Sequence, residues 1–176
     1  MNAFLAAGFS VEAFYLDNSI TSAAVIGTTQ NQMGWGIYHH NSKKVPYFVT
    51  GSGKTYNAAY ATKTISDTEL IHVVATYDPM EKVHTIYVNG EECSDRATSQ
   101  PGTNIPGVVA ANTTSTDGIA MFNTFGMGGD LSSATSSAGD FLATDLTVVD
   151  AKIYNKTLTA EEVAEAYSKA VAEFTE

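Results

Sequence analysis

Leu70-Ile-His-Val-Val-Ala-Thr-Tyr-Asp78, followed by Lys82-Val-His-Thr-Ile-Tyr-Val-Asn-Gly90, is the stretch that decides the fold of this 176-residue chain. Apolar and polar residues alternate in both segments, which is the period-2 pattern of half-buried β-strands. Proline ends the first strand at Asp78-Pro79, and Asn89-Gly90 supplies the positive φ of a tight turn after the second. The stretch predicts an antiparallel hairpin. One face is expected to carry Ile71, Val73, Ala75 and Tyr77, with Val83, Thr85 and Tyr87 paired against them.

The length, net charge and cysteine content of the chain limit the classes of protein to which it can belong. A chain of 176 residues is predicted to form a single domain, residues 1–176. The formal net charge of −10 argues against nucleic acid as a partner, because the chain has few basic residues to neutralise phosphates. No apolar run approaches the length of a membrane span, so no membrane insertion is expected. The single cysteine, Cys93, cannot form an internal disulfide.

Further strands are predicted on both sides of the hairpin. The segments with strand-like patterns are 9–16, 23–27, 35–39, 45–49, 55–61, 119–125 and 141–154. Segments 35–39 and 45–49 are predicted to pair with each other. The long region 96–118 contains prolines, glycines and small polar residues, so we expect an irregular loop there.

The C-terminal segment, residues 159–174, is predicted to be a helix packed on the sheets. Thr159 as N-cap and Glu162 three residues later make a capping box. Leu158 before the cap and Val163 inside the helix have the spacing of a hydrophobic staple. Apolar residues recur at helical spacing from Val163 to Phe174, which gives the helix one apolar face.

Three separated blocks of this sequence carry a family resemblance. They are Phe9-Ser-Val-Glu-Ala13, the hairpin pattern from His72 to Gly90, and Ile153-Tyr-Asn155 with Leu158-Thr-Ala-Glu-Glu-Val163. Together they resemble the laminin-G-like β-sandwiches of the concanavalin-A-like superfamily. The resemblance implies an all-β fold, an antiparallel two-sheet jelly-roll sandwich with a C-terminal α-helix.

The resemblance also raises an expectation about the N-terminus. Members of the family usually have a strand before the Phe9 block, where it closes the sheet beside the last strand. Only eight residues precede Phe9 here, so we expect either a fragment of a longer protein or an abbreviated strand at 4–7. An unpaired edge would favour a homodimer formed through that edge strand.

A run of aromatic, imidazole and amide side chains is the candidate ligand site. Aromatic rings stack on the apolar faces of sugars, while amides and imidazoles bind sugar hydroxyls. The alternative interpretation is that the aromatic residues of this run belong to the core. Tyr60 and Asn41 lie nearby in the sequence. The predicted ligand-binding residues are Trp35, Tyr38, His39, His40, Tyr47, Tyr56 and Asn57.

Metal and proton-transfer sites are weaker predictions. His72 and His84 fall on neighbouring predicted strands and would form a cross-strand pair able to bind a metal or relay a proton. The family resemblance implies a structural calcium ion at a loop rim, held by aspartates near strand ends, and no cofactor is required otherwise. The candidate calcium ligands are Asp17, Asp117, Asp130, Asp140 and Asp145.

The predicted function is a non-catalytic module that binds a carbohydrate or another ligand, within a larger secreted or cell-surface protein. The resemblance also fits modules appended to hydrolases. One alternative is a structural or protein-interaction domain without a small ligand. A glycoside hydrolase is the weaker alternative, because Asp67-Thr-Glu69 is preceded by Ile65 where a catalytic carboxylate would be needed. The expected partner is therefore a glycan or a protein.

Overall fold

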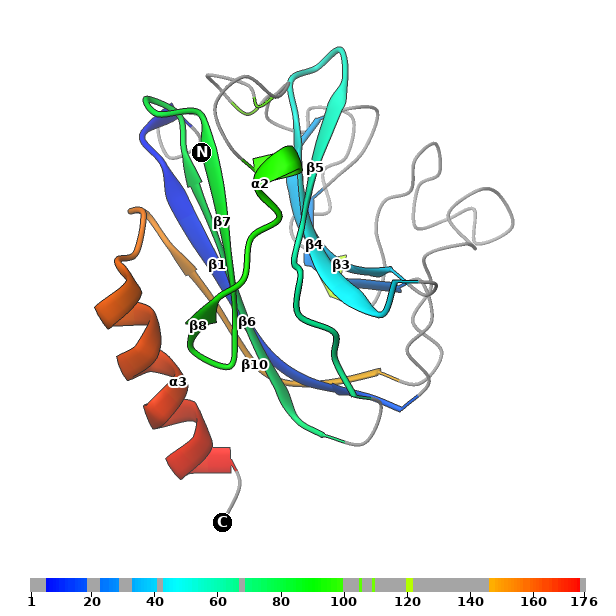
Figure 1. The fold of residues 1–176 in the computed structure, drawn as a ribbon, viewed down its shortest axis with the longest axis vertical. Helices are drawn as coiled ribbons and strands as arrows, with labels where there is room; N and C mark the ends of the chain where they lie inside the picture. Colours follow the sequence, from blue (N-terminus) through cyan, green and yellow to red (C-terminus); the bar gives the residue numbers. More distant parts are fainter. Residues whose placement is uncertain are drawn as a thin grey trace.

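Two antiparallel β-sheets face each other in the computed structural model, which describes residues 6–18, 23–28, 33–40, 43–66, 69–99, 105, 109, 120–121 and 146–174 (Figure 1). Sheet A has the strand order β10-β1-β6-β7-β8, and sheet B has the order β5-β4-β3-β2-β9. The strands of sheet A are β10 (Leu146–Tyr154), β1 (Phe9–Asp17), β6 (Ile71–Asp78), β7 (Val83–Val88) and β8 (Glu91–Glu92). The strands of sheet B are β5 (Tyr56–Tyr60), β4 (Val45–Gly51), β3 (Trp35–His40), β2 (Ala23–Gly27) and β9 (Ala120–Met121). The predicted all-β sandwich is confirmed.

The β6–β7 hairpin forms as predicted, but its register differs by one residue. Asp78 pairs with Val83, so each odd-numbered residue of β6 faces an even-numbered residue of β7, as Tyr77 faces His84. The expectation that Val83, Thr85 and Tyr87 share a face with Tyr77 was wrong. Four residues connect the paired positions, and an even connection joins residues of opposite parity. The following turn has the predicted positive φ values, 52° at Asn89 and 79° at Gly90.

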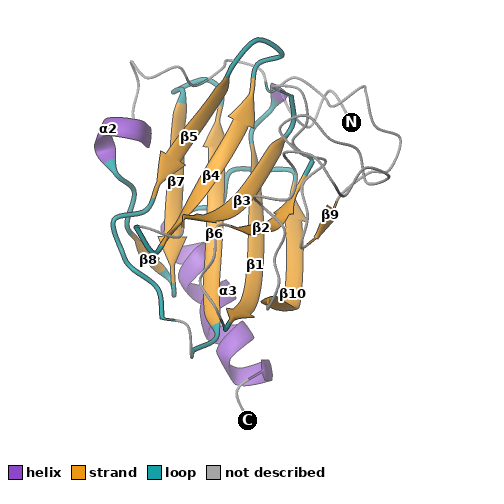
Figure 2. Ribbon diagram, turned by 90° about the vertical axis from the view of Figure 1, so that its right-hand side faces the viewer, coloured by secondary structure: helices purple, strands orange, loops and turns teal. Residues whose placement is uncertain are grey.

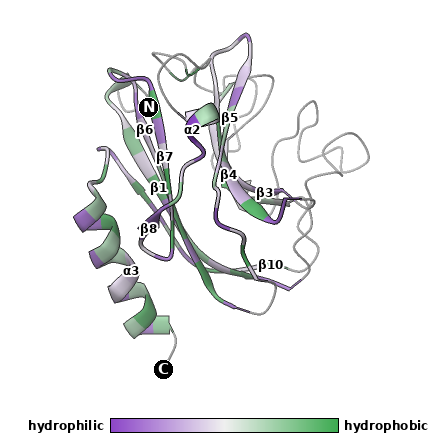
Figure 3. Cartoon of the chain, viewed as in Figure 1, coloured by the Kyte–Doolittle hydropathy of each residue, from purple (hydrophilic) through white to green (hydrophobic). Residues whose placement is uncertain are grey.

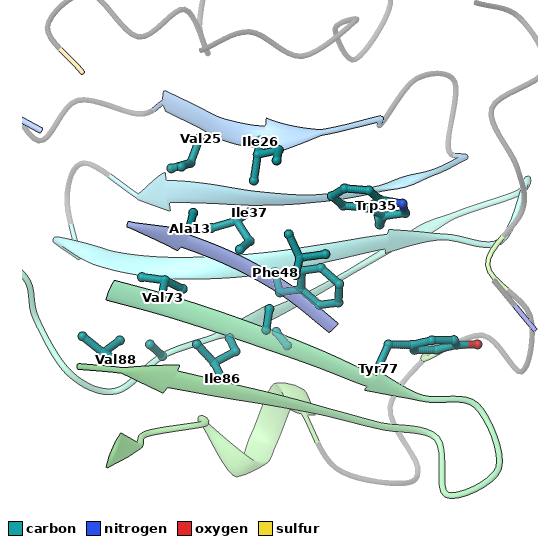
Figure 4. Packing of buried hydrophobic residues seen from close by; sticks show 14 of the residues in the cluster. Ala13, Val25, Ile26, Trp35, Ile37, Phe48, Val73, Tyr77, Ile86 and Val88 are labelled. Atoms are coloured by element: carbon teal, nitrogen blue, oxygen red, sulfur yellow. The ribbon is translucent and has the colours of Figure 1, made fainter. Parts of the chain in front are cut away.

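The hydrophobic core lies between the two sheets (Figure 4). Phe9 of β1 packs against both sheets, with ring centroids 5.3 Å from Tyr77 of sheet A and 6.1 Å from Phe48 of sheet B. The region 96–118, expected to be an irregular loop, also contributes a helix and two residues of the core. It contains a short helix, α2 (Arg96–Ser99), and it places Ile105 and Val109 in this core at 4% and 1% exposure.

Strand β1 lies inside sheet A, between β10 and β6. It pairs with β10 from Ser10 opposite Tyr154 to Asp17 opposite Leu146. The open edge expected beside the last strand is present among the described strands, because β10 pairs with β1 on one side only, and the homodimer through this edge stays a prediction. Among the described strands, β10 is the edge of this sheet. Ala6 and Ala7 are not strand residues, and positions 4–5 lie outside the described residues.

The C-terminal helix α3 (Ala160–Phe174) covers the outer face of sheet A, the side away from sheet B (Figure 1). Both halves of the predicted capping box form. The Thr159 amide donates to Glu162 Oε2 at 3.0 Å, and the Glu162 amide donates to Thr159 Oγ1 at 3.3 Å. Leu158 and Val163 pack in one cluster, as the predicted staple requires. Figure 3 shows green apolar positions alternating with polar ones around this helix, which fits one buried and one solvated face. Within the described residues, no helix is long and apolar enough to cross a bilayer.

Candidate functional site

The seven predicted ligand-binding residues are divided between the two faces of sheet B, whose strands lie in front in Figure 2. Side chains alternate along a strand, so neighbouring positions of one segment face opposite sides. The outer face, away from sheet A, carries Tyr38, His40, Tyr47 and Tyr56. The inner face, toward sheet A, carries Trp35, His39 and Asn57.

Trp35 belongs to the hydrophobic core. It is 3% exposed, and its ring centroid lies 5.9 Å from that of Phe9 on the opposite sheet (Figure 4). A ring in this position cannot offer a face to a sugar, so Trp35 is removed from the candidate ligand site. The sequence contained a signal for this burial. Trp35 and the core residue Ile37 are two positions apart on one strand, so their side chains point to the same side.

His39 is fully buried in a polar network that joins the two sheets. Its Nδ1 lies 2.6 Å from Asp17 Oδ2, and because a carboxylate only accepts, Nδ1–H donates this hydrogen bond. Its Nε2 therefore accepts from the Tyr15 hydroxyl. Burial and the nearby Asp17 carboxylate raise the pKa of Tyr15 well above its usual value. This network bridges the sheets structurally, and His39 is not available to an external ligand.

Asn57 also lies toward the inside of the sandwich. It pairs with Thr50 across β4 and β5, and the Thr50 hydroxyl lies 3.0 Å from His84 Nε2 of sheet A. The buried Oδ1 of Asn57 has no hydrogen-bond partner among the described residues. Its position between the sheets separates it from the outward tyrosines.

A ladder of three tyrosines crosses the outer face of sheet B. Tyr38, Tyr47 and Tyr60 are directly opposite one another on β3, β4 and β5. Tyr47 stacks on Tyr38 with ring centroids 5.2 Å apart and planes 22° apart, and on Tyr60 at 5.2 Å and 25°. His40 packs edge-on against Tyr47 and Tyr60, at 6.2 and 5.9 Å. Tyr38 is only 4% exposed, so within the tyrosine ladder (Tyr38, Tyr47 and Tyr60) the half-buried Tyr47 and Tyr60 form the candidate binding surface, and Tyr38 supports them from below.

The two ends of the ladder are shaped by residues that the sequence did not indicate. The Tyr38 ring lies over Gly36, where a Cβ atom would be 2.7 Å from Tyr38 Cε2. At the other end, Lys43 Nζ lies 4.1 Å from the centroid of the Tyr60 ring, within reach of a cation–π interaction. Burial, with a smaller effect from Tyr60, raises the pKa of the Tyr47 hydroxyl, so it remains a neutral donor and acceptor.

His72 and His84 do not form the predicted cross-strand pair. With the observed register, His84 points between the sheets, where Phe48 and Tyr77 surround it, and burial lowers its pKa to about 3. His72 points to the opposite face, under α3, where its ring lies 5.6 Å from that of Tyr167. A metal or proton relay shared by the two histidines is excluded by this geometry.

His72 instead belongs to a buried charged cluster with Glu12. Its Nε2–H donates to Glu12 Oε1 at 3.1 Å, while the Tyr154 hydroxyl donates to Oε2. Desolvation would raise the pKa of Glu12, but these hydrogen bonds and the charges of His72 and Lys152 lower it to about 2. Glu12 forms part of the floor of a groove of about 310 Å³ between α3 and β10. The lysines that line this groove, Lys152, Lys156 and Lys169, each pair with a carboxylate.

The described part of the chain assembles no metal centre, and it contains only part of the predicted carboxylate triplet. No group of three or more His, Cys, Asp or Glu side chains that could hold a metal occurs within it. Asp17 binds His39, and the other four candidate calcium ligands lie outside the described residues, so calcium binding stays a prediction. Of the carboxylate triplet, Glu69 is exposed before β6, and Asp67 lies outside the described residues.

Comparison with known families finds one match, which covers most of the chain. Residues 2–164 match the laminin G family model described as the concanavalin A-like lectin/glucanases superfamily. Among curated proteins, none matches this sequence significantly.

Solved structures share the same sandwich at low sequence identity. A heptameric SAP-like pentraxin from Limulus polyphemus superposes with a TM-score of 0.62 at 12% identity, over 91% of this chain and 69% of the pentraxin. A Trypanosoma rangeli sialidase gives 0.58 at 15% identity, over 97% of this chain and 24% of the sialidase. The binding domain of botulinum neurotoxin DC, solved with rat synaptotagmin II, gives 0.58 at 13% identity, over 96% and 37%. These superpositions, at such low identities, show a shared fold alone, and this chain spans only part of the larger neighbours.

Proposed function

Because this chain belongs to the concanavalin A-like lectin/glucanases superfamily, we propose that it is a non-catalytic binding module whose ligand is a carbohydrate, bound on the outer face of sheet B. The proposal includes a larger, secreted or cell-surface parent protein. The family fold serves many activities, so the assignment depends on the side chains of one face and not on the fold.

The observation that carries the proposal is the tyrosine ladder. The outer face of sheet A is covered by α3, whereas the outer face of sheet B presents half-buried Tyr47 and Tyr60 with His40 beside them. Partly exposed aromatic residues that meet polar side chains are typical of ligand-binding surfaces. Stacking holds the rings in place before a ligand arrives, which lowers the entropy lost on binding.

Phenol and imidazole groups are suited to sugar hydroxyls. Each phenol can donate one hydrogen bond and accept others, and the imidazole of His40 has a donor and an acceptor nitrogen when neutral. The raised pKa of Tyr47 keeps its hydroxyl protonated at any physiological pH. A neutral donor–acceptor row of this kind can bind hydroxyls without the cost of burying a charge.

A protein-interaction module is the second candidate, and exposed apolar residues of sheet A favour it. Val149 and Ile153 of β10 are 37% and 36% exposed, and Met80 in the β6–β7 turn is 87% exposed. A strand edge that carries apolar side chains can pair with a strand of another chain. The homodimer predicted from the sequence would use this same edge, the one formed by the last strand, β10.

A broad polysaccharide and glycan array, run with calcium and with chelator, tests the proposal. We expect saturable binding that Tyr60→Ala weakens by about 1–3 kcal/mol, as loss of an interface aromatic typically does. Met80→Ala, on the other sheet, is the matched control and should bind normally. Loss of binding with chelator would add the calcium ion. Failure to bind any glycan under both conditions would contradict the proposal and favour the protein-interaction candidate.

A further inference from the structure

Sheet B carries a charge opposite to that of the rest of the chain. Between Asp17 and Asp67 the sequence contains no Asp or Glu, although the whole chain has 19. This segment, residues 18–66, holds four lysines and includes β2, β3, β4 and β5. Its formal charge is +4, while the remaining five basic and 19 acidic residues give −14. A strongly acidic protein therefore keeps four strands of one sheet free of carboxylates.

Of the four lysines in this segment, Lys63 pairs with Glu91 of β8, and the other three have a different environment. Lys43, Lys44 and Lys54 are exposed, and none of them forms an ion pair within the described part of the chain. Lys152, Lys156 and Lys169 pair with carboxylates, whereas Lys82 in the β6–β7 turn forms no ion pair within the described residues but has Glu81 and Asp78 nearby in the sequence. Unpaired lysines without nearby acids keep their full attraction for an anion from solution.

These lysines lie at the two ends of the outer face. Lys43 belongs to the turn between β3 and β4 and covers the Tyr60 ring. Lys54 belongs to the turn between β4 and β5, next to Tyr56. Between these two turns, β4 runs from Val45 to Gly51, six residue steps or roughly 20 Å at the usual rise of a strand. The face thus has Lys43 beside Tyr60 at one end of the strands and Lys54 near Tyr56 at the other, and the tyrosine strip (Tyr47, Tyr56 and Tyr60) lies between them.

The geometry of the ladder favours an anion over the apolar face of a neutral sugar. Both faces of the Tyr47 ring are covered, by Tyr38 and by Tyr60, and the Tyr60 ring has Lys43 against it. The rings therefore present their edges and hydroxyls to a ligand. Ring edges carry the positive part of the aromatic quadrupole, and hydroxyls donate hydrogen bonds. Edges, hydroxyls and lysines all attract negative charge.

We propose that the ligand of this face is an acidic glycan, a polysaccharide whose carboxylate or sulfate groups bind Lys43 and Lys54 while its hydroxyls contact the tyrosine strip. The inference rests on the proposed function and specifies its ligand class. An acidic polymer with charges about 20 Å apart would reach both lysines, given the length of β4 between the two turns.

Matched pairs of polysaccharides test the ligand class. Binding to dextran sulfate and polygalacturonate is compared with binding to their uncharged counterparts, dextran and galactan, by isothermal titration calorimetry in 50 and 300 mM NaCl. We expect each acidic polymer to bind at least tenfold more tightly than its neutral counterpart, with a Kd that rises with salt. Comparison of the two acidic polymers distinguishes sulfate from carboxylate. Tight binding to neutral polymers without salt dependence would overturn the inference and leave the proposed function intact, whereas no binding to any polymer would contradict both.

Lysine variants test the location. Lys43→Gln and Lys54→Gln should each weaken binding of dextran sulfate about fivefold, and Lys43→Arg should restore it, because only the charge is required. Lys82→Gln, an exposed lysine in the β6–β7 turn, is the matched control and should have no effect. Equal weakening by Lys82→Gln, or equal binding of single-stranded oligothymidylate, would show unspecific attraction of polyanions and would overturn the inference. Thermal denaturation confirms that each variant is folded.

Discussion

Protonation of His84 should make this protein sensitive to mild acid. The side chain is fully buried between the sheets, where its Nε2 lies 3.0 Å from Thr50 Oγ1 and the aromatic ring of Phe48 packs edge-on against it. Burial lowers its pKa from 6.5 to about 3. The unfolded chain therefore binds a proton that the folded chain does not, at every pH between these two values. The stability that depends on neutral His84 is fully present above pH 6.5 and is lost progressively as the pH falls toward 3.

The magnitude follows from the shift in pKa. Each unit corresponds to 1.36 kcal/mol, so a fall from pH 7.5 to 4.5, with titration beginning at 6.5, should remove about 3 kcal/mol from the free energy of unfolding. That loss is large beside a typical domain stability of about 5–15 kcal/mol. His84→Gln removes the titration and retains a side chain that can hydrogen-bond to Thr50.

Urea unfolding of both proteins at pH 7.5 and 4.5 measures the difference. The variant starts less stable at pH 7.5, because it loses the ring contacts of His84, but it should lose about 3 kcal/mol less on acidification than the wild type. Other groups titrate in both proteins and cancel in the comparison. Equal losses in the two proteins would refute the argument that His84 is buried in its neutral form.

Three further substitutions have defined outcomes. Glu12→Gln should cost about 3 kcal/mol in urea unfolding at pH 7, because the pKa of this carboxyl is lowered from 4.5 to about 2; the wild type should lose that advantage as the pH falls from 4.5 toward 2, and a constant difference would contradict this. Gly90→Ala should destabilise by about 1–2 kcal/mol in the same assay, because φ is 79° and the new Cβ would lie 3.0 Å from Tyr167; unchanged stability would show that the turn relaxes. Gly36→Ala should cost about 1 kcal/mol of stability and weaken dextran sulfate binding several-fold by displacing Tyr38, and normal binding would show that the ladder is not required.

The fold could be predicted because its signals are local and strong. The alternation in β6 and β7, the Asn89-Gly90 turn and the capping box of α3 each have one structural solution, and each forms as expected. The predicted hairpin register was wrong. The register depends on the number of residues that the β6–β7 turn places between paired positions, and the alternation alone does not specify that number.

The candidate site was only partly predictable. A cluster of aromatic residues in sequence says nothing about which face each one occupies, and alternation separates Trp35 and His39 from Tyr38 and His40. Applying the period-2 rule to this segment would have made that separation from the sequence. The position of Lys43 over the Tyr60 ring could not be derived in this way, because it depends on the conformation of the β3–β4 turn.

The sequence patterns also failed to predict which polar and charged side chains are buried. The Asp17–His39–Tyr15 network joins residues of two sheets, and the Glu12–His72 pair joins two strands under a helix. Charged and polar residues are usually solvent-exposed, so a pattern-based reading places them on surfaces. Only the tertiary arrangement supplies the partners that make their burial favourable.

The location of the ligand is the central claim, and an NMR titration tests it most directly. Amide chemical shifts of the ¹⁵N-labelled protein are followed during addition of a short sulfated dextran fragment. The account predicts that the changes concentrate on β3, β4 and β5, with the largest at Tyr47 and Tyr60. Changes confined to β10 and α3, with the tyrosine strip unaffected, would contradict it.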